Sequence, residues 1–512
     1  MDQISRRDFL KLSSAFLGAT VFSSPSFLLN GQPKQIPNII VLVFDAMSAK
    51  HLSIYGYPRN TTPNFERFSK RAIVYHSNYA GASFTSPGTA TLLTGLYPWK
   101  HRAFNLGGLV ARDLISDNLF SLLGESYYSV GFSQNDWANN LLTEFRSGLD
   151  SKIPPSAFSS KDIRLLFSSL IPDDELLMYY AFDEYLGRTH TVINPIPGSL
   201  SLGFLDSFST YKQETQTTSS ETYPYGMPSN NYYFYYENKT VFAEIAKTIE
   251  QLNQNSPFVG YFHFYAPHSP YAPHEEFVGI FKDMPLPKKP RHRLSYMKFP
   301  QRTLKHNRDH YDEYIANVDA EFGNLVDSLE RTGILNNSYL VLASDHGEVF
   351  ERGEVGHGTA LLYEPVIRTP LIISEPDQKQ RMDVYSPTCN TDLVPTLLHL
   401  AGKEIPNNID GRILPGLGGI ADDERPIFSV EAKENSSFFP LEKTTIALNR
   451  ENHKLIYYSG YERYNQQFEF FDLNEDPEEL TNLFDTGTST VLQMKDELLT
   501  ALDEANRPFR KR

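Results

Sequence analysis

Short apolar runs alternate with segments of helical periodicity along most of this chain. Continuous β-branched and aromatic runs occupy 39–44, 258–264 and 339–343, as expected for strands that are buried on both faces of a parallel sheet. Apolar residues within 241–249 and 314–329 recur every three or four positions, which is typical of one face of a helix. This alternation of strands and helices predicts an α/β fold.

The predicted strands lead into residues that bind metals or substrates. Asp45 follows the first run, and the pair Asp345 and His346 follows the third closely. The second run leads into Pro267-His268-Ser269-Pro270, a loop whose prolines present His268 rigidly. Because ligand sites of open α/β sheets gather at the carboxyl ends of the strands, we expect these side chains to share a site.

A short helix is predicted between Pro87 and Gly95. Pro87 suits the first helical position, and Gly95 suits the residue just past the end. Thr85 then lies at the start of the helix, where unpaired backbone N–H groups and the positive end of the helix dipole favour an anion. An ordinary Ser/Thr helix cap gives the same local pattern, so the interpretation depends on the partners of Thr85.

Together these residues predict a divalent-metal site with oxygen and nitrogen ligands. The predicted metal ligands are Asp45, Thr85, Asp345 and His346. The ion would activate the threonine hydroxyl and neutralise charge on an ester oxyanion. His268 and His357 could bind substrate oxygens or protonate the leaving group. His263 lies inside a predicted strand, where a hydrogen-bonded core histidine and a functional histidine are equally consistent with the sequence.

The composition is that of a large globular chain, with 512 residues, 40% of them hydrophobic and 21% charged. A net charge of −15 argues against nucleic acid or an anionic membrane as the main partner. An anionic substrate would therefore need a local positive site, which a metal ion supplies. The only cysteine, Cys389, excludes an intrachain disulfide and is expected to be a small buried residue.

Residues 1–33 are predicted to be an export signal. Ser5-Arg6-Arg7-Asp8-Phe9-Leu10-Lys11 resembles a twin-arginine signal, and a mildly apolar stretch from Leu12 to Leu29 follows it. Serines and Pro25 interrupt this stretch, which weakens a membrane span. The signal predicts a periplasmic or extracellular protein that is exported folded. Membrane contact is expected only through this segment, if it is not cleaved.

Residues 190–232 are rich in Ser, Thr, Pro, Gly and Tyr, which predicts an irregular insertion. Its tyrosines either line a substrate pocket or pack the loop against the body of the protein, and the second interpretation is favoured. Near the C-terminus, residues 491–502 predict an amphipathic helix.

A collinear series of short motifs resembles the sulfatase family of the alkaline phosphatase superfamily. The motifs are Asn38–Asp45, Tyr55-Gly56-Tyr57 with Thr62-Pro63-Asn64, Thr85-x-Pro87 through Leu93–Pro98, Pro267-His268-x-Pro270-Tyr271, Asp345–Glu348, Gly356–Gly358, Asp392–Leu397, Lys454–Ile456, Phe471–Leu473 with Asp476-Pro477-x-Glu479, and Asn482-Leu483. They span residues 36–485, and so many motifs in one order are specific for the superfamily.

The resemblance implies a large mixed, mostly parallel sheet sandwiched by helices in a catalytic domain of residues 36–425. It also implies a smaller C-terminal α+β subdomain of residues 426–512. Asp45, Asp345 and His346 would bind the metal, and position 85 would hold the nucleophile. By the same resemblance, His268 and His357 would contact the substrate.

The chain departs from the sulfatase pattern at two places. Sulfatases that use formylglycine carry Cys or Ser at the nucleophile position and Arg four residues later, whereas this chain has Thr85 and Thr89. No formylglycine is therefore expected, and the nearer relatives are phosphoester and phosphonate hydrolases and phosphoglycerol or phosphoethanolamine transferases with an unmodified threonine. Ala46 stands where calcium-binding sulfatases often place another aspartate. Mn²⁺ is therefore favoured over Ca²⁺, while Mg²⁺ and Zn²⁺ stay open.

We therefore expect a metal-dependent hydrolase of sulfate or phosphate esters that forms a covalent intermediate on Thr85. A threonine ester must be released by a second in-line displacement, which suits phosphoryl groups. The substrate would be an anionic ester of a small molecule, a glycan or a lipid. The alternatives are a phosphoglycerol- or phosphoethanolamine-type transferase with the same site, and a non-catalytic binding protein that retains the fold.

Overall fold

The computed structural model describes residues 36–159, 161–162, 221–230, 234–255, 257–281, 284–295, 297–462 and 464–510. The predicted export segment at 1–33 lies outside these residues, as does most of the predicted insertion at 190–232. Within the described ranges, none of the helices combines the length and the apolar character that a membrane span requires.

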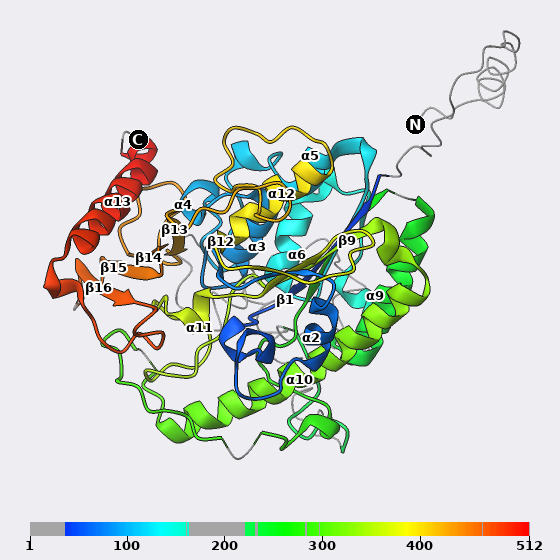
Figure 1. Ribbon diagram of the computed structural model, residues 1–512, viewed down its shortest axis with the longest axis horizontal. Helices are drawn as coiled ribbons and strands as arrows, with labels where there is room; N and C mark the ends of the chain where they lie inside the picture. The colour runs from blue at the N-terminus through cyan, green and yellow to red at the C-terminus, as the bar shows by residue number, and fades with distance from the viewer. Residues whose placement is uncertain are drawn as a thin grey trace, which may run out of the picture. The chain divides into compact units, whose positions relative to one another are not determined.

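An eight-stranded sheet forms the centre of the fold (Figure 1). Its strands follow one another in the order β11 (Met382–Val384), β2 (Ile73–Tyr75), β10 (Leu371–Ser374), β9 (Ser338–Ala343), β1 (Asn38–Phe44), β8 (Phe258–Phe264), β4 (Tyr128–Ser133) and β5 (Ser151–Lys152). Neighbouring strands are parallel, except that β10 runs antiparallel to both β9 and β2. The prediction of a large mixed, mostly parallel sheet is confirmed.

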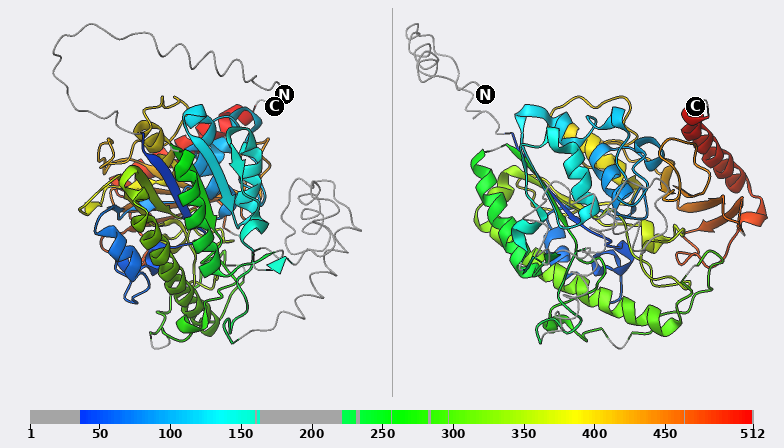
Figure 2. Two further views of the ribbon diagram at one scale, coloured as in Figure 1. Left: turned by 90° about the vertical axis from the view of Figure 1, so that its right-hand side faces the viewer. Right: turned by 180° about the vertical axis from the view of Figure 1, so that it is seen from behind.

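Helices cover both faces of this sheet (Figures 1 and 2). On one face lie α2 (Pro63–Ser69), α9 (Asn238–Leu252) and α10 (Gln301–Arg331). On the other face lie α3 (Thr85–Thr94), α5 (Leu119–Leu123), α6 (Asp136–Glu144) and α12 (Leu393–Leu400). Alternate residues of β1 pack on opposite sides, with Leu42 in the first layer and Val43 in the second. This double burial explains why β1 is apolar almost throughout.

The helix starts follow the sequence signals with one difference. Pro63 is the first residue of α2, as predicted. The helix α3 begins at Thr85, two residues before Pro87, and ends before Gly95, whose φ is 71°. Pro87 is tolerated at the third position because the first turn of a helix leaves its backbone N–H groups without intrahelical partners. Thr85 therefore stands in the first turn of α3.

The C-terminal part forms a second, antiparallel sheet. Its strands are β13 (Ile427–Glu431), β14 (Thr444–Arg450), β15 (His453–Ser459) and β16 (Gln467–Asp472). The helix α13 (Ser489–Asn506), drawn in red in Figure 1, packs Val491, Met494 and Leu498 against this sheet. This confirms the predicted α+β architecture, while its separation as a domain at residue 425 stays a prediction.

Several other short elements belong to the described chain, besides short 3₁₀ helices. They are α4 (Pro98–His101), α11 (Glu364–Ile367), the pair β12 (Thr388–Cys389) and β3 (Asn78–Tyr79), and the pair β6 (Lys161–Asp162) and β7 (Phe234–Tyr235). Cys389 is buried and unbridged, as expected. Tyr223 and Tyr225 belong to the predicted insertion, and Tyr236 follows it closely. Tyr223 and Tyr236 are buried, and the rings of Tyr225 and His310 stack with their centroids 3.8 Å apart. These tyrosines therefore pack against the body, as favoured from the sequence.

Candidate active site

The site lies where four neighbouring parallel strands end. In the sheet register His263 of β8 is opposite Val43 of β1 and Ser133 of β4, and Val43 is in turn opposite Ala343 of β9. The residues just beyond these strands therefore meet at one edge of the sheet. Ligand sites of open α/β sheets gather at this edge.

The strand alternation directs the key side chains to one face. Val41 and Val43 of β1, Tyr261 of β8 and Ala343 of β9 belong to the layer packed under α3. Side chains two residues farther along each strand continue on the same face. Asp45, His263 and Asp345 are those side chains. The architecture thus brings two carboxylates and an imidazole together beneath the first turn of α3.

These three side chains form a compact, buried group. Asp45, His263 and Asp345 are each 0% exposed, and a ligand atom of each lies within 4.8 Å of the others. His263 Nε2 lies 3.5 Å from Asp45 Oδ2 and 3.8 Å from Asp345 Oδ2. The sequence left the role of His263 open, and the structure places it between the two predicted acidic ligands.

His346 faces the same pair of carboxylates. Its Nε2 lies 3.4 Å from Asp45 Oδ1 and 3.6 Å from Asp345 Oδ2. Its other nitrogen, Nδ1, lies 2.9 Å from the carbonyl oxygen of Gly347 and donates its proton there. Burial, reinforced by the nearby His357, holds the pKa of His346 well below its ordinary value. The imidazole is therefore neutral, with the Nε2 lone pair directed at the carboxylates.

The two carboxyl groups have opposite pKa shifts. Burial opposes the ionisation of Asp45, but the surrounding His268, His263 and His346 hold its pKa below the ordinary range. Burial and the negative charge of Asp45 together raise the pKa of Asp345 well above its ordinary value. Two carboxylates this close repel each other, and a cation between them would allow both to ionise.

Unsatisfied buried atoms also fit a metal ion. Asp45 Oδ1, His263 Nε2 and Asp345 Oδ2 have no hydrogen-bond partner among the described residues. Each buried polar atom left unsatisfied costs roughly 1–3 kcal/mol. A divalent ion coordinated by these atoms would remove that cost, so the residues present fit the cation that the sequence predicts.

Thr85 stands beside this group. Its side chain is 2% exposed, and its Oγ1 lies 3.4 Å from His346 Nε2. Asn135 Nδ2 donates to Thr85 Oγ1 at 3.3 Å and also to Asp45 Oδ2. The hydroxyl predicted as the nucleophile is therefore in direct contact with two groups of the cluster.

The sequence interpretation missed Asn135. This residue follows β4, and its Oδ1 accepts the backbone N–H of Trp137 at 2.8 Å, so it also caps α6. A polar residue just beyond a buried strand is the same signal that singled out Asp45. The signal was present, although β4 is less apolar than β1.

The two predicted substrate histidines lie next to each other. The ring centroids of His268 and His357 are 4.8 Å apart, and those of His346 and His357 are 4.3 Å apart. Val349 and Gly356 exchange backbone hydrogen bonds, which turns the chain back and brings His357 Nδ1 to 3.2 Å from Glu348 Oε2. All of the side chains predicted from the sequence thus belong to one cluster.

These two histidines differ in their protonation. Burial lowers the pKa of His268 below its ordinary value, with a further contribution from His357. Burial opposes the charge of His357 as well, but the carboxylate of Glu348 outweighs it and raises the pKa of His357 above its ordinary value. Neighbouring groups with divergent pKa values are the usual arrangement for dividing acid and base roles.

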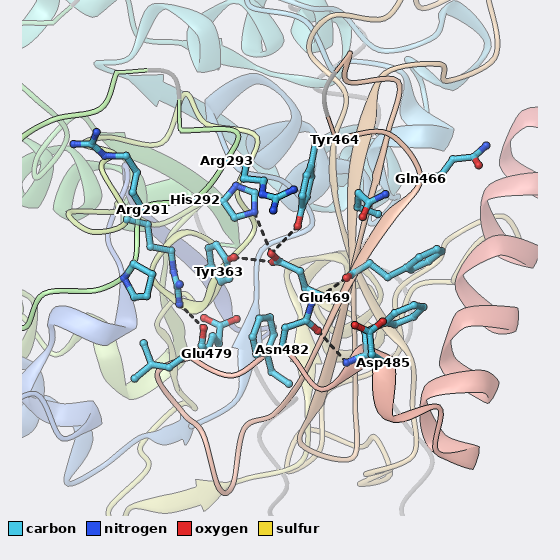
Figure 3. Close-up of a pocket in the computed structure, with 17 residues that line it drawn as sticks. Arg291, His292, Arg293, Tyr363, Tyr464, Gln466, Glu469, Glu479, Asn482 and Asp485 are labelled. Atoms are coloured by element: carbon cyan, nitrogen blue, oxygen red, sulfur yellow. Dashed lines mark hydrogen bonds and ion pairs between the residues drawn. The ribbon is translucent and has the colours of Figure 1, made fainter.

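A pocket of about 420 Å³ lies elsewhere, between loop 290–293 and the C-terminal sheet (Figure 3). Glu469 at its centre accepts hydrogen bonds from His292 Nε2 at 3.1 Å, Tyr363 Oη at 2.7 Å and Tyr464 Oη at 3.1 Å. Its lining includes none of the predicted site residues. Because the carboxylate of Glu469 already accepts these hydrogen bonds, it gives no sign of a missing ligand, in contrast to the unpartnered atoms of Asp45, His263 and Asp345.

Comparisons with known proteins identify the family of this chain. The family model described as Sulfatase matches residues 37–184 and 196–403. The model described as N-sulphoglucosamine sulphohydrolase, C-terminal, matches residues 353–507. A choline-sulfatase of Rhizobium meliloti (strain 1021) is 23% identical over 493 residues, which cover 89% of this chain and 84% of that protein.

Two solved structures illustrate the shared fold. A phosphonate monoester hydrolase of Agrobacterium radiobacter superposes with a TM-score of 0.65 at 19% identity, over 92% of this chain and 96% of that one. A protein in complex with its substrate D-glucosamine-2-N,6-O-disulfate superposes with a TM-score of 0.63 at 19% identity, over 93% and 98%. The Sulfatase model matches more than half of the chain. The chain therefore belongs to the sulfatase family of the alkaline phosphatase superfamily and is an enzyme of the sulfuric ester hydrolase class.

Proposed function

We propose that this enzyme hydrolyses an anionic sulfate or phosphate ester through a covalent intermediate on unmodified Thr85, with one divalent metal ion. The observation that carries the proposal is the position of Thr85 Oγ1, 3.4 Å from His346 Nε2 and 3.3 Å from Asn135 Nδ2. A hydroxyl that only capped α3 would bond the backbone of the helix, whereas Thr85 makes these contacts with site side chains.

The reaction consists of two displacements at the same central atom. The Thr85 hydroxyl gives its proton to a neighbouring base, for which His268 is the candidate, as its oxygen attacks the phosphorus or sulfur of the ester. The bond from that atom to the alcohol oxygen breaks, and this oxygen takes a proton from His357. A water molecule then attacks the Thr85 ester and returns a proton to His357, while the bond to the Thr85 oxygen breaks and this oxygen takes back its proton, which releases phosphate or sulfate. The Thr85 ester has no aldehyde hydrate from which the group could be eliminated, so a second in-line displacement must release it, and this suits phosphoryl groups.

The side chains divide the work by their charges. Asp45, Asp345 and His346 would hold the ion, whose chemistry when bound is to polarise the ester and to stabilise ionised oxygen. The neutral His268 can accept a proton or bind a substrate oxygen. His357, whose pKa Glu348 raises, can in its protonated form donate a proton to the leaving alcohol.

The substrate class follows from charge and from the relatives. A chain with a net charge of −15 needs a local cationic site to bind an anion, and the ion with His357 supplies it. The printed names of the relatives include a choline-sulfatase and a structure with a disulfated glucosamine as its substrate. We propose that the substrate is an anionic ester of a small molecule, a glycan or a lipid.

We also propose that the protein is exported through the twin-arginine segment at residues 1–33.

The test is Thr85→Ala, compared with Thr85→Ser, on chromogenic aryl sulfates, phosphate monoesters and phosphate diesters. Thr85→Ala should lose turnover, while Thr85→Ser keeps a nucleophilic oxygen and should retain a measurable fraction. Mass spectrometry of acid-quenched enzyme should find one phosphoryl or sulfuryl group on the peptide that contains residue 85. Full turnover by Thr85→Ala would overturn the proposal. Addition of glycerol distinguishes hydrolysis from transfer, because a transferase would form the glycerol ester.

A further inference from the structure

His263 is a buried, polar residue inside the otherwise apolar strand β8. Its side chain is 0% exposed, and Nε2 has no hydrogen-bond partner among the described residues. The nitrogen is aimed at the carboxylates of Asp45 and Asp345, which are also fully buried. A histidine that served only the core would have both nitrogens satisfied.

The contacts of this nitrogen are not hydrogen bonds. At 3.5 Å from Asp45 Oδ2 and 3.8 Å from Asp345 Oδ2, the separations exceed those of N–H···O bonds. This separation is not peculiar to His263. The neighbouring His346 Nε2 lies at similar distances, 3.4 Å and 3.6 Å, from the same two carboxylates. Two imidazoles thus face two carboxylates, at distances of 3.4–3.8 Å.

This spacing fits the donors around one small ion. A tetrahedral ion with ligand bonds of about 2.0–2.2 Å has donors that lie about 3.3–3.6 Å apart. An octahedral Mg²⁺ with bonds of about 2.0–2.1 Å has adjacent donors about 2.8–3.0 Å apart. The observed range of 3.4–3.8 Å is close to the tetrahedral value.

The second nitrogen of His263 is positioned by Tyr261. Nδ1 lies 3.0 Å from Tyr261 Oη, on the same face of β8 two residues earlier. A tyrosine phenol is neutral at ordinary pH, so its oxygen can accept a hydrogen bond. With the proton of His263 on Nδ1 and donated to the tyrosine oxygen, the Nε2 lone pair faces the carboxylates. Metal-binding histidines are commonly oriented by such a bond on the other nitrogen.

We propose that His263, oriented by Tyr261, is a fourth protein ligand of the ion. It would take the place of the additional aspartate ligand that is absent because position 46 is an alanine. The inference rests on the proposed function only for the presence of the ion. His346 and His263 then supply two imidazoles beside two carboxylates, and Thr85 Oγ1 lies next to these four donors, 3.4 Å from His346 Nε2.

This donor set changes the expected metal. Ca²⁺ takes six to eight oxygen ligands, and the described site offers two carboxylates and two nitrogens. Imidazole ligands suit Zn²⁺ and related ions, and Zn²⁺ binds a given site of this kind more tightly than Mn²⁺. The preference for Mn²⁺ inferred from one histidine therefore moves to Zn²⁺ when the second histidine is counted.

The test measures binding of each metal alone to the chelator-treated full chain, by competition with a chromophoric chelator. The wild type should bind one Zn²⁺ more tightly than Mn²⁺, and Ca²⁺ most weakly. His263→Ala should weaken Zn²⁺ binding on the order of 100-fold or more, and Tyr261→Phe by about 10-fold. His292→Ala is the matched control, since this histidine is also largely buried beside a carboxylate, Glu469, and should leave Zn²⁺ affinity unchanged.

A measurement on the wild type alone guards against variants that fail to fold. X-ray absorption of the Zn²⁺-loaded protein should count two imidazole ligands. One imidazole, or unchanged Zn²⁺ affinity in folded His263→Ala, would overturn the proposal, as would tighter binding of Ca²⁺ than of Zn²⁺. These readouts do not depend on turnover. A failure of Thr85 as the nucleophile would leave them intact, and their failure would leave the Thr85 experiment intact.

Discussion

A Cβ atom at Gly88 would lie 2.6 Å from the backbone oxygen of Asp345. Real Cβ atoms do not approach a backbone oxygen this closely, so only glycine lets α3 come so near to the end of β9. The same helix carries Thr85 in its first turn, and Asp345 and His346 follow the end of the same strand. The distance between Thr85 and Asp345 therefore depends on the absence of a side chain at Gly88.

Gly88→Ala should separate these two elements. Overpacking of a well-packed interior costs about 1–3 kcal/mol of stability. A shift of about 1 Å in the position of a reacting group lowers turnover on the order of 100-fold. We expect a lower Tm, and a loss of kcat that exceeds the fraction of unfolded protein at the assay temperature. Thermal unfolding and steady-state kinetics of the same preparation measure both.

Gly358→Ala is the matched control for that variant. An added Cβ at Gly358 would meet no atom within 4 Å, although the residue is next to His357. It should leave Tm and kcat close to those of the wild type. If Gly88→Ala behaved like Gly358→Ala, the close packing of α3 on β9 would not determine the site geometry.

Thr85→Cys, produced together with a formylglycine-generating enzyme, should gain little or no aryl sulfatase activity. The sequence that such maturation uses in sulfatases has an arginine four residues after the cysteine, where this chain has the buried Thr89. Mass spectrometry of the peptide that contains residue 85 would show whether an aldehyde forms. Efficient conversion with strong sulfatase activity would instead show that the site is built for formylglycine.

The protonation of His357 predicts a pH dependence. Burial opposes the charge of this imidazole, but Glu348, 3.2 Å away, raises its pKa above the ordinary value. The protonated form that donates to the leaving group is present below that pKa, and activity falls as pH rises through it. Glu348→Gln removes the stabilising charge and lowers the pKa of His357, so the alkaline limb of the kcat profile should move to lower pH.

The control for that shift is Glu431→Gln. Glu431 is equally buried and accepts a hydrogen bond from Tyr461 in the C-terminal sheet. Its substitution can change stability but should leave the alkaline limb of the kcat profile in place. An unmoved limb in Glu348→Gln would mean that His357 is not the proton donor.

The sequence predicts most of this architecture because its strongest signals are local. Asp45 ends a continuous apolar strand, and a sheet of parallel strands leaves only one edge at which such a residue can act. His263 could not be assigned in the same way, because strand periodicity shows its face but not what lies opposite. The partner of that face is α3, whose approach depends on a contact between Gly88 and Asp345 that lie 257 positions apart in the numbering.

Asn135 illustrates a second limit. Its strand, β4, contains Ser129, Gly131 and Ser133, so the apolar pattern that marked β1 is weak. These small residues lie on the face where α6 packs, and Leu142 of that helix would lie 3.2 Å from a Cβ at Gly131. The close packing that requires small residues also weakens the periodic signal. The sequence signal for Asn135, which links Asp45 to Thr85, is therefore weaker than the signal for Asp45.

Glu144 lies outside the candidate site, and its raised pKa predicts how the stability of the folded protein depends on pH. Burial raises the pKa of this half-buried carboxyl, which accepts the Val110 N–H at 3.0 Å, from its ordinary value of 4.5 to about 7. The folded state therefore binds this proton more tightly than the unfolded state. Between the two pKa values stability falls as pH rises, and above pH 7 the loss is complete.

Glu144→Gln should remove that loss, because the amide is neutral at every pH and its oxygen can still accept the Val110 N–H. The variant should match the wild type near pH 4.5 and be more stable at pH 8. The gain should be on the order of 1 kcal/mol, because water screens a half-buried group. Thermal unfolding of both proteins at the two pH values measures it. The exposed Glu404→Gln should show no such difference. An equal Tm for Glu144→Gln and the wild type at pH 8 would mean that Glu144 ionises in the folded protein without cost.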